Sequence, residues 1–297
     1  MGDTLTAAVV APSLTLPAPA KLNLFLHVTG RRADGYHLLE SVFVPINLAD
    51  TVTLVRRDDS AVRLVDAPAG LDEQTELCCR AARALQAATG SALGVDIHVS
   101  KRVPQGAGLG GGSSDAATTL LGLNRLWRLG QSREALQQVA AGIGADVPFF
   151  VFGQPALARG VGERLLAVTA PVTDYVLAFP GAGVATGSVF TDSLLKRDTP
   201  VNPVAVFEPD YGHNDLQPVA ERLEPRIAAL RADMARLCPP GTTPRMTGSG
   251  ACVFARAHNR QTAGEIALQL GRSGWQSWPV RTIARHPLLS MADSAII

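Results

Sequence analysis

A glycine-rich segment in the first half of the chain has the composition of a phosphate-binding loop. Five glycines lie between positions 106 and 112, and Ser113, Ser114 and an Ala- and Leu-rich run follow them. Glycine lacks Cβ, so such a loop can adopt positive φ and bring several N–H groups close to a ligand. A helix that starts directly after the loop adds free N–H groups and the positive end of its dipole. The residues that we predict to form this anion site are Pro104, Gln105, Gly106, Ala107, Gly108, Leu109, Gly110, Gly111, Gly112, Ser113 and Ser114.

The loop differs from three other phosphate-binding loops. Its glycines match the dinucleotide fingerprint, but residues 95–100 before it alternate apolar and polar, unlike a strand buried on both faces. No Lys follows the glycines, which excludes a Walker A loop. The chain has no His-Arg-Asp or Asp-Phe-Gly tripeptide, which disfavours a protein kinase. A surface turn without a ligand is the remaining alternative, and a plain turn does not need five glycines at a helix start.

Two charged residues outside the loop are candidates for chemistry. Asp146 lies between a predicted helix end and Pro148, so its carboxylate can project from the end of an element. Taken alone, however, an Asp in this position is more simply explained by an Asx turn. Lys21 shares one face of a predicted strand with Asn23, Phe25 and His27, and an exposed Lys is the ordinary interpretation. Phe25 argues against that interpretation, because it would be out of place on a face that only meets solvent.

Composition limits the class of protein. The chain has 297 residues, 46% hydrophobic and 18% charged, with a net charge of +1, which disfavours a nucleic-acid groove or a membrane surface. Residues 1–20 contain one charged residue, Asp3, and so lack the basic segment of a signal peptide, and no apolar run is long enough to span a membrane. Four cysteines without a C-x-x-C spacing predict reduced thiols and a cytoplasmic location.

The predicted elements fall into two halves. The strands that we expect are 21–28, 40–55, 61–66, 94–100, a short region after residue 148, 175–180, 251–256 and 275–284. The expected helices are 73–89, one capped by Ser113 or Ser114 and ending at 129, 132–142, 186–196, 215–237 and 260–272. Strands, then helices, then a mixed half predict an α+β fold with two lobes, which we divide into residues 1–163 and 164–297.

Several motifs, in this order and spacing, resemble those of the GHMP small-molecule kinase superfamily. They are residues 19–24, 35–37, 104–115 and 144–148, with a late glycine motif at 247–252. The resemblance runs from about residue 17 to residue 285. The general superfamily loop is shorter, and the extra glycines resemble the branch whose substrate is 4-diphosphocytidyl-2-C-methyl-D-erythritol.

The resemblance implies a two-lobed GHMP-kinase fold, with an N-terminal ribosomal-S5-like lobe for ATP and a C-terminal ferredoxin-like α/β lobe. It implies ATP and Mg²⁺, and transfer of the γ-phosphoryl group to the 2-hydroxyl of that substrate, in non-mevalonate isoprenoid precursor synthesis. The expected partner is this small molecule, with no nucleic acid or membrane, and the expected state is a monomer or weak homodimer.

The resemblance also implies roles for individual residues. Lys21 and Asp146 would be catalytic, which reverses the Asx-turn interpretation. The substrate would contact Asn23, Tyr36, His37, Thr186 and Phe190, with the cytosine read by His37 and stacked on an aromatic ring. Gly187 replaces the usual proline after Thr186, and Phe190 would serve equally well as a core residue. Ser113, Ser114 and Asp146 are candidate Mg²⁺ contacts, among which the sequence does not choose.

Two other functions compete with this one. A GHMP kinase for homoserine or mevalonate would lack the extended glycine loop and the Gly-Tyr-His turn. A catalytically inactive binding module on the same fold would not need to retain both Lys21 and Asp146.

Overall fold

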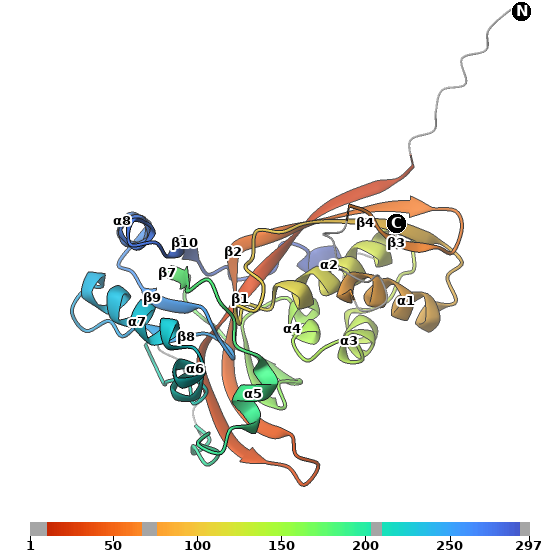
Figure 1. Cartoon of the computed structure of the whole chain (residues 1–297). Coiled ribbons are helices and arrows are strands. Elements are labelled where there is room, and N and C mark those ends of the chain that lie inside the picture. Colours follow the sequence, from red (N-terminus) through yellow and green to blue (C-terminus); the bar gives the residue numbers. More distant parts are fainter. Residues whose placement is uncertain (1–10, 67–75, 203–209, 292–297) are drawn as a thin grey trace, which may run out of the picture.

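Two long antiparallel strands form the centre of the molecule. The computed structural model describes residues 11–66, 76–202 and 210–291. Strands β1 (Ser13–Arg31) and β2 (His37–Arg57) pair along most of their length, with three shifts of register. In Figure 1 they run between two groups of helices. Both faces of β1 are buried from Ala18 to Val28, which explains why Phe25 shares a face with polar residues.

The first half of the fold is a six-stranded sheet with helices on one side. Strand β2 pairs with β1 and is also the centre of a row in the order β3 (Val62–Leu64), β4 (Gly94–Ser100), β2, β5 (Ala156–Gly160) and β6 (Arg164–Ala167). The helices are α1 (Leu77–Thr89), α2 (Gly111–Leu126), α3 (Arg133–Ala141) and α4 (Val147–Phe152). Helix α2 is the central one, since it contacts β1, β2 and the other three helices. Burial of this helix fixes the direction of the glycine loop that precedes it.

The second half is an antiparallel sheet covered by helices. Its strand order is β10 (Gln276–Arg281), β7 (Asp174–Phe179), β9 (Val253–Arg256) and β8 (Arg245–Met246). The helices are α5 (Thr186–Thr191), α6 (Gln217–Leu223), α7 (Pro225–Leu237) and α8 (Arg260–Arg272), and a 3₁₀ turn, η1 (Leu289–Met291), follows β10. This mixed architecture confirms the predicted α+β class. Among the described residues, no helix combines the length and apolar character that a membrane span requires.

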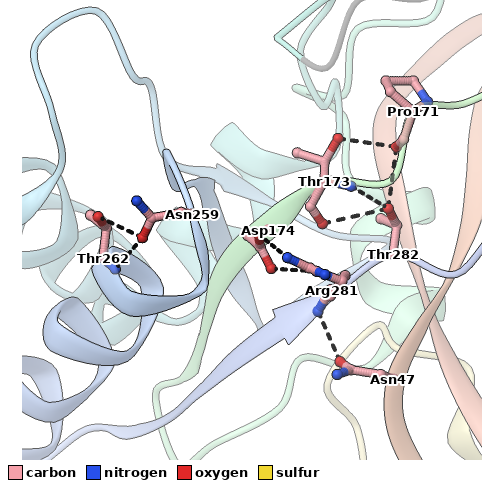
Figure 2. Close-up of polar contacts among 8 residues, drawn as sticks. All are labelled: Asn47, Pro171, Thr173, Asp174, Asn259, Thr262, Arg281 and Thr282. Atoms are coloured by element: carbon pink, nitrogen blue, oxygen red, sulfur yellow. Dashed lines mark hydrogen bonds and ion pairs between the residues drawn. The ribbon is translucent and has the colours of Figure 1, made fainter.

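Polar contacts at the end of β10 connect the two halves (Figure 2). The guanidinium of Arg281 binds both oxygens of Asp174 at 2.8 and 2.7 Å and lowers the pKa of that carboxyl group. The backbone N–H of Arg281 donates to Oδ1 of Asn47 in β2 at 2.8 Å, and the next residue but one, Ile283, donates to the carbonyl of Pro45 at 2.9 Å. Figure 2 also shows Asn259, which caps α8 through the N–H of Thr262.

Several predicted boundaries are wrong, each for a local reason. Helix α2 is preceded by Gly110 at φ +68°, not capped by Ser113 or Ser114, because the loop turns directly into the helix. The short strand expected between Pro148 and Gly160 is β5, but it begins only at Ala156, because Val147–Phe152 form helix α4. The helix expected over 215–237 is broken at Glu224, because Pro225 starts a new helix.

The other predicted boundaries differ less from those in the structure. Helix α5 begins at Thr186 itself and ends at Thr191, short of the predicted 196. Residues 73–75 of the first predicted helix lie outside the described residues, and α1 starts at Leu77. Strand β6 follows residue 163 yet pairs with β5 of the first sheet. The division of the chain between residues 163 and 164 stays a prediction.

Candidate active site

A cavity of about 1090 Å³ is lined by residues from both halves of the fold. The predicted site residues that line it are Lys21, Asn23, Tyr36, His37, Pro104, Gln105, Gly106, Ala107, Gly108, Leu109, Gly110, Gly111, Gly112, Ser113, Asp146, Thr186 and Phe190. Ser114 is the exception. Its side chain is fully buried and its hydroxyl donates to the carbonyl of Pro19 at 2.7 Å. Ser114 therefore anchors the start of α2 to β1, and the expectation that it contacts phosphate or Mg²⁺ is not met by its position.

The glycine loop is held against β1 and against a turn of the second half. The N–H of Lys21 donates to the carbonyl of Leu109 at 3.0 Å. Gly108 has φ +74°, and a Cβ there would lie 2.2 Å from the carbonyl oxygen of Thr247. A Cβ on Gly248 would lie 2.7 Å from the carbonyl oxygen of Gly108. The two segments thus approach backbone to backbone, which only glycine allows.

The N-terminus of α2 opens onto this cavity. Gly110, which precedes the helix, offers no side-chain acceptor to the first backbone N–H groups. Gly111, Gly112 and Ser113, which carry those groups, all line the cavity. Unsatisfied N–H groups at the positive end of a 16-residue helix attract an anion, as the sequence predicts for this loop.

We expect Gly108→Ala to lower the affinity for ATP, the nucleotide that the resemblance implies. The added Cβ meets backbone, so the loop must move, and losing one hydrogen bond to a charged phosphate costs about 1.5–3 kcal/mol, which is about a tenfold to hundredfold loss of affinity. Titration calorimetry with ATP measures the change. Gly90→Ala is the matched control, because Gly90 has φ +70° with nothing within 4 Å and closes α1 away from the cavity. Unchanged ATP affinity in Gly108→Ala would show that the loop does not bind the phosphates.

Lys21, Asn23 and Asp146 form a polar group in the cavity wall. Nζ of Lys21 lies 3.5 Å from Oδ2 of Asp146, donates to Oδ1 of Asn23, and is 5.0 Å from the ring centroid of Phe43. The Lys21 side chain is only 4% exposed, whereas that of Asp146 is 33% exposed. The buried ammonium group therefore has a fixed position, and the carboxylate beside it can reach a ligand.

Asn23 is oriented by its neighbours. Its Nδ2 donates to Oγ of Ser41 at 2.9 Å, and its backbone N–H donates to Oγ1 of Thr247 at 2.9 Å. Because its Oδ1 accepts from Lys21, both ends of the Asn23 amide have partners within the protein. Its position suits holding the Lys21 ammonium group as well as lining the cavity for a substrate.

Asp146 is placed by the start of helix α4. It precedes Val147 and Pro148, and its side chain makes no capping hydrogen bond to that helix. The Asx-turn interpretation of Asp146 is therefore wrong. Its carboxylate lies beside Lys21 and the cavity instead.

The aromatic side chains of Tyr36, His37 and Phe190 also line the cavity. Tyr36 follows the β1–β2 turn, is 65% exposed, and has its N–H bound to Oδ1 of Asp34 at 3.2 Å. The ring of His37 lies 5.1 Å from that of Phe190 at an interplanar angle of 34°. Phe190 is partly buried against the core, so it serves the core and the cavity together. Thr186 hydrogen-bonds Ser249 at 2.7 Å, which joins α5 to the late glycine motif.

Sequence reasoning missed a charged cluster beside the loop. Nζ of Lys101 lies 2.5 Å from Oδ2 of Asp50 and 2.6 Å from Oδ2 of Asp115, and Lys101 and Asp115 line the cavity. Burial raises the pKa of Asp115 to about 7, opposed by Lys101 and reinforced by Asp50. Burial lowers the pKa of Lys101, but the two carboxylates outweigh it and the net direction is upward. Asp115 ends the motif at residues 104–115, but no spacing links it to Lys101 and Asp50, and the three residues meet only where β2, β4 and α2 converge.

Oxygen ligands suited to Mg²⁺ are present, although no metal cluster is. Within the described residues, no group of three His, Cys, Asp or Glu side chains could hold a metal ion. The carboxylates of Asp115 and Asp146 and the hydroxyl of Ser113 nevertheless line the same cavity, and Oδ1 of Asp115 is buried without a hydrogen-bond partner. Mg²⁺ bound to a nucleotide usually keeps several waters and needs only one or two protein oxygens.

Comparison with known proteins places the chain in a family. Residues 76–154 match the GHMP kinases N terminal domain, and residues 206–276 match the GHMP kinases C terminal domain. A protein of Cupriavidus necator named 4-diphosphocytidyl-2-C-methyl-D-erythritol kinase is 50% identical over 282 residues, covering 93% of this chain and 95% of the relative. A protein of the same name from Ralstonia pickettii is 49% identical over 282 residues, covering 93% and 96%.

Solved structures agree with the sequence relatives. A crystal structure of 4-(cytidine 5'-diphospho)-2C-methyl-D-erythritol kinase matches with a TM-score of 0.77 and 38% identity, over 91% of this chain and 99% of that one. A homoserine kinase from Cytophaga hutchinsonii matches with a TM-score of 0.70 and 17% identity, over 95% and 98%, which shows a shared fold alone. The chain belongs to the 4-diphosphocytidyl-2-C-methyl-D-erythritol kinase family of the GHMP kinases.

Proposed function

We propose that this kinase transfers the γ-phosphoryl group of ATP to the 2-hydroxyl of 4-diphosphocytidyl-2-C-methyl-D-erythritol, a step of non-mevalonate isoprenoid precursor synthesis. One observation carries the chemical part of the proposal. A carboxylate and a buried ammonium group, 3.5 Å apart, line a single cavity with a glycine loop and an aromatic pocket. The relatives that bear the substrate's name support the choice of acceptor.

Each part of the cavity then has a task in phosphoryl transfer. The loop and the N-terminus of α2 hold the phosphates of ATP through backbone N–H groups. Asp146 orients the acceptor hydroxyl and removes its proton as the oxygen attacks phosphorus. Lys21 keeps Asp146 in place and stabilises negative charge on the transferring group. Mg²⁺ bound with ATP, near Asp146, Asp115 or Ser113, would neutralise phosphate charge.

The cytidine part of the acceptor would lie beside the aromatic side chains of the cavity. The methylerythritol part offers little apolar surface, whereas a base offers a flat face and a polar edge. Tyr36 and Phe190 supply aromatic faces, and His37 supplies a polar edge beside them. A polar group that is buried without its hydrogen-bond partner costs binding free energy. A site of this kind therefore discriminates strongly against a base whose polar edge does not match.

We expect steady-state assays to show ATP turnover with the cytidyl substrate and much poorer turnover with its uridine-linked analogue. Turnover with homoserine or mevalonate instead would favour the competing kinases, and no turnover with any acceptor would favour the inactive module. His37→Ala is expected to lose most of the preference for cytidine. If the preference survives in that variant, other residues read the base and His37 only supports the turn.

Three further parts of the proposal concern the surroundings of the enzyme. We propose a cytoplasmic location, no nucleic-acid or membrane partner, and a monomer or weak homodimer. The mixed charges, which sum to +1, support the absence of a polyanionic partner. Light scattering on the purified protein over a range of concentrations tests the oligomeric state.

A further inference from the structure

Arg197 lies behind His37 and is not part of the cavity lining. We infer that Arg197 is a positioning residue that selects the His37 tautomer facing the base, and thereby sets the preference for cytosine over uracil. The inference deepens the proposed function and rests on the part of it that assigns the base to His37.

One hydrogen bond decides which nitrogen of His37 carries the proton. Nε of Arg197 donates to Nε2 of His37 at 3.0 Å. A guanidinium group has only donors and stays protonated, so Nε2 must be the acceptor. The proton of the neutral imidazole is then on Nδ1, because the two tautomers differ only in that choice.

Arg197 is itself fixed in place. Its Nη1 donates to the carbonyl of Leu195 at 2.9 Å, and its Nη2 donates to the carbonyls of Asp192 at 2.6 Å and Phe190 at 3.2 Å. These carbonyls belong to the end of α5 and the segment after it, which also carry the ring that faces His37. The Arg197 guanidinium group therefore fixes the ring of His37 relative to the segment that carries Phe190.

The surroundings of His37 disfavour its protonated form. Burial first, then Arg197 and Arg31, lower its pKa below the ordinary value. A neutral ring with a proton on Nδ1 has one donor that the bond to Arg197 does not use, on a residue that lines the cavity. Within the described residues, Nδ1 of His37 has no hydrogen-bond partner.

A donor at this position distinguishes cytosine from uracil, because the two bases differ at N3. N3 of cytosine is an acceptor, whereas N3 of uracil carries a hydrogen. A donor fixed at Nδ1 pairs with the cytosine edge but faces a second donor in uracil, which leaves two N–H groups opposed and unpaired. If His37 could exchange tautomers freely, it would accept from uracil N3–H and the discrimination would fall.

Arg197→Met tests the inference, because it keeps an unbranched apolar stem and removes every donor. We expect the ¹⁵N chemical shifts of His37 to change from the Nδ1–H tautomer to a mixture. We also expect the ratio of kcat/KM for the cytidyl and uridyl substrates to fall by about tenfold or more, as expected when a polar base contact is no longer enforced. Arg197→Lys retains a donor and should keep most of both properties.

Arg222→Met is the matched control. Arg222 forms an ion pair with Asp192 in the same segment and does not contact His37. The Arg222→Met variant should loosen the segment after α5 without changing the tautomer of His37 or the preference for cytosine. Thermal unfolding of all variants identifies any general loss of structure.

Two results would overturn the inference. The first is an unchanged His37 tautomer in Arg197→Met, and the second is a changed tautomer with unchanged base preference. The His37→Ala variant separates this failure from failure of the proposed function. If His37→Ala loses the preference while Arg197→Met keeps it, His37 reads the base without help from Arg197, and if both keep it, the proposed role of His37 is also wrong.

Discussion

Asp146→Asn is expected to lower kcat by about 10²–10⁴, the usual contribution of a positioned acid or base. Asparagine keeps the shape of the side chain but cannot take a proton from the acceptor hydroxyl. Asp146 is one-third exposed and makes no capping bond to α4, but its charge is paired with the buried ammonium group of Lys21, so thermal unfolding of the variant is measured as well. Single-turnover measurements of phosphoryl transfer, with ATP affinity measured in parallel, separate the chemical step from binding.

The control for Asp146→Asn removes the same charge elsewhere. Asp58 is 87% exposed in the turn after β2, and Asp58→Asn should leave kcat and ATP affinity unchanged. Asp146→Asn with near-normal turnover would exclude Asp146 as the base. A loss of ATP binding without a slower chemical step would assign it to the nucleotide instead.

Lys21→Met is expected to lower kcat and kcat/KM together by about 10²–10³, the effect of removing one group that stabilises transition-state charge. Methionine fills most of the volume of the buried lysine stem, so the variant removes the charge without leaving a large hole. The Lys21 ammonium group is held by Asn23 and lies 3.5 Å from Asp146, which means that it is in position before the substrate binds. Steady-state kinetics at several substrate concentrations give both parameters.

A change confined to KM would contradict this prediction and make Lys21 a binding residue. Lys196→Met serves as the control, since Lys196 is an exposed lysine that does not line the cavity. Both variants lose one positive charge, so a slower reaction in Lys21→Met alone reflects the position of the charge and not the net charge of the protein.

Local sequence determined most helix and strand positions, because the signals act over a few residues. Ser132 caps α3, Asn259 caps α8, and Gly90 closes α1 at φ +70°. The glycine loop and the helix after it are also local features, so the anion site could be placed from sequence. Where local signals conflicted, a boundary was missed: the strand expected after Pro148 begins only at Ala156, because the residues before it form α4 and pack against α2 and α3.

The resemblance to a family supplied the members of the candidate site, but not how they are held. Ser114 belongs to the glycine motif and yet faces β1, since its hydroxyl is taken by the carbonyl of Pro19. The amide of Asn23 is shared between Lys21 and Ser41. The packing of β1 against its neighbours determines these partners. The spacing of motif residues along the chain contains no information about that packing.

The sequence by itself determined the chemical types in the site, namely a glycine loop, a lysine, a carboxylate and a pair of aromatic residues. Only the tertiary structure decided which of them meet. Lys101 contacts Asp50 and Asp115 across three elements, and Arg197 reaches His37 across 160 positions of the chain. The Lys101 cluster depends on the packing of β2, β4 and α2 within the first half. The contact of Arg197 with His37 depends on the docking of the two halves, which the burial of β1 on both faces and the polar contacts at the end of β10 hold together. The alternation of apolar residues and the turn residues can be read from neighbouring positions, so helices and strands can be predicted from sequence. The orientation of a charged side chain depends on partners that are distant in sequence, and only folding brings them within hydrogen-bond distance.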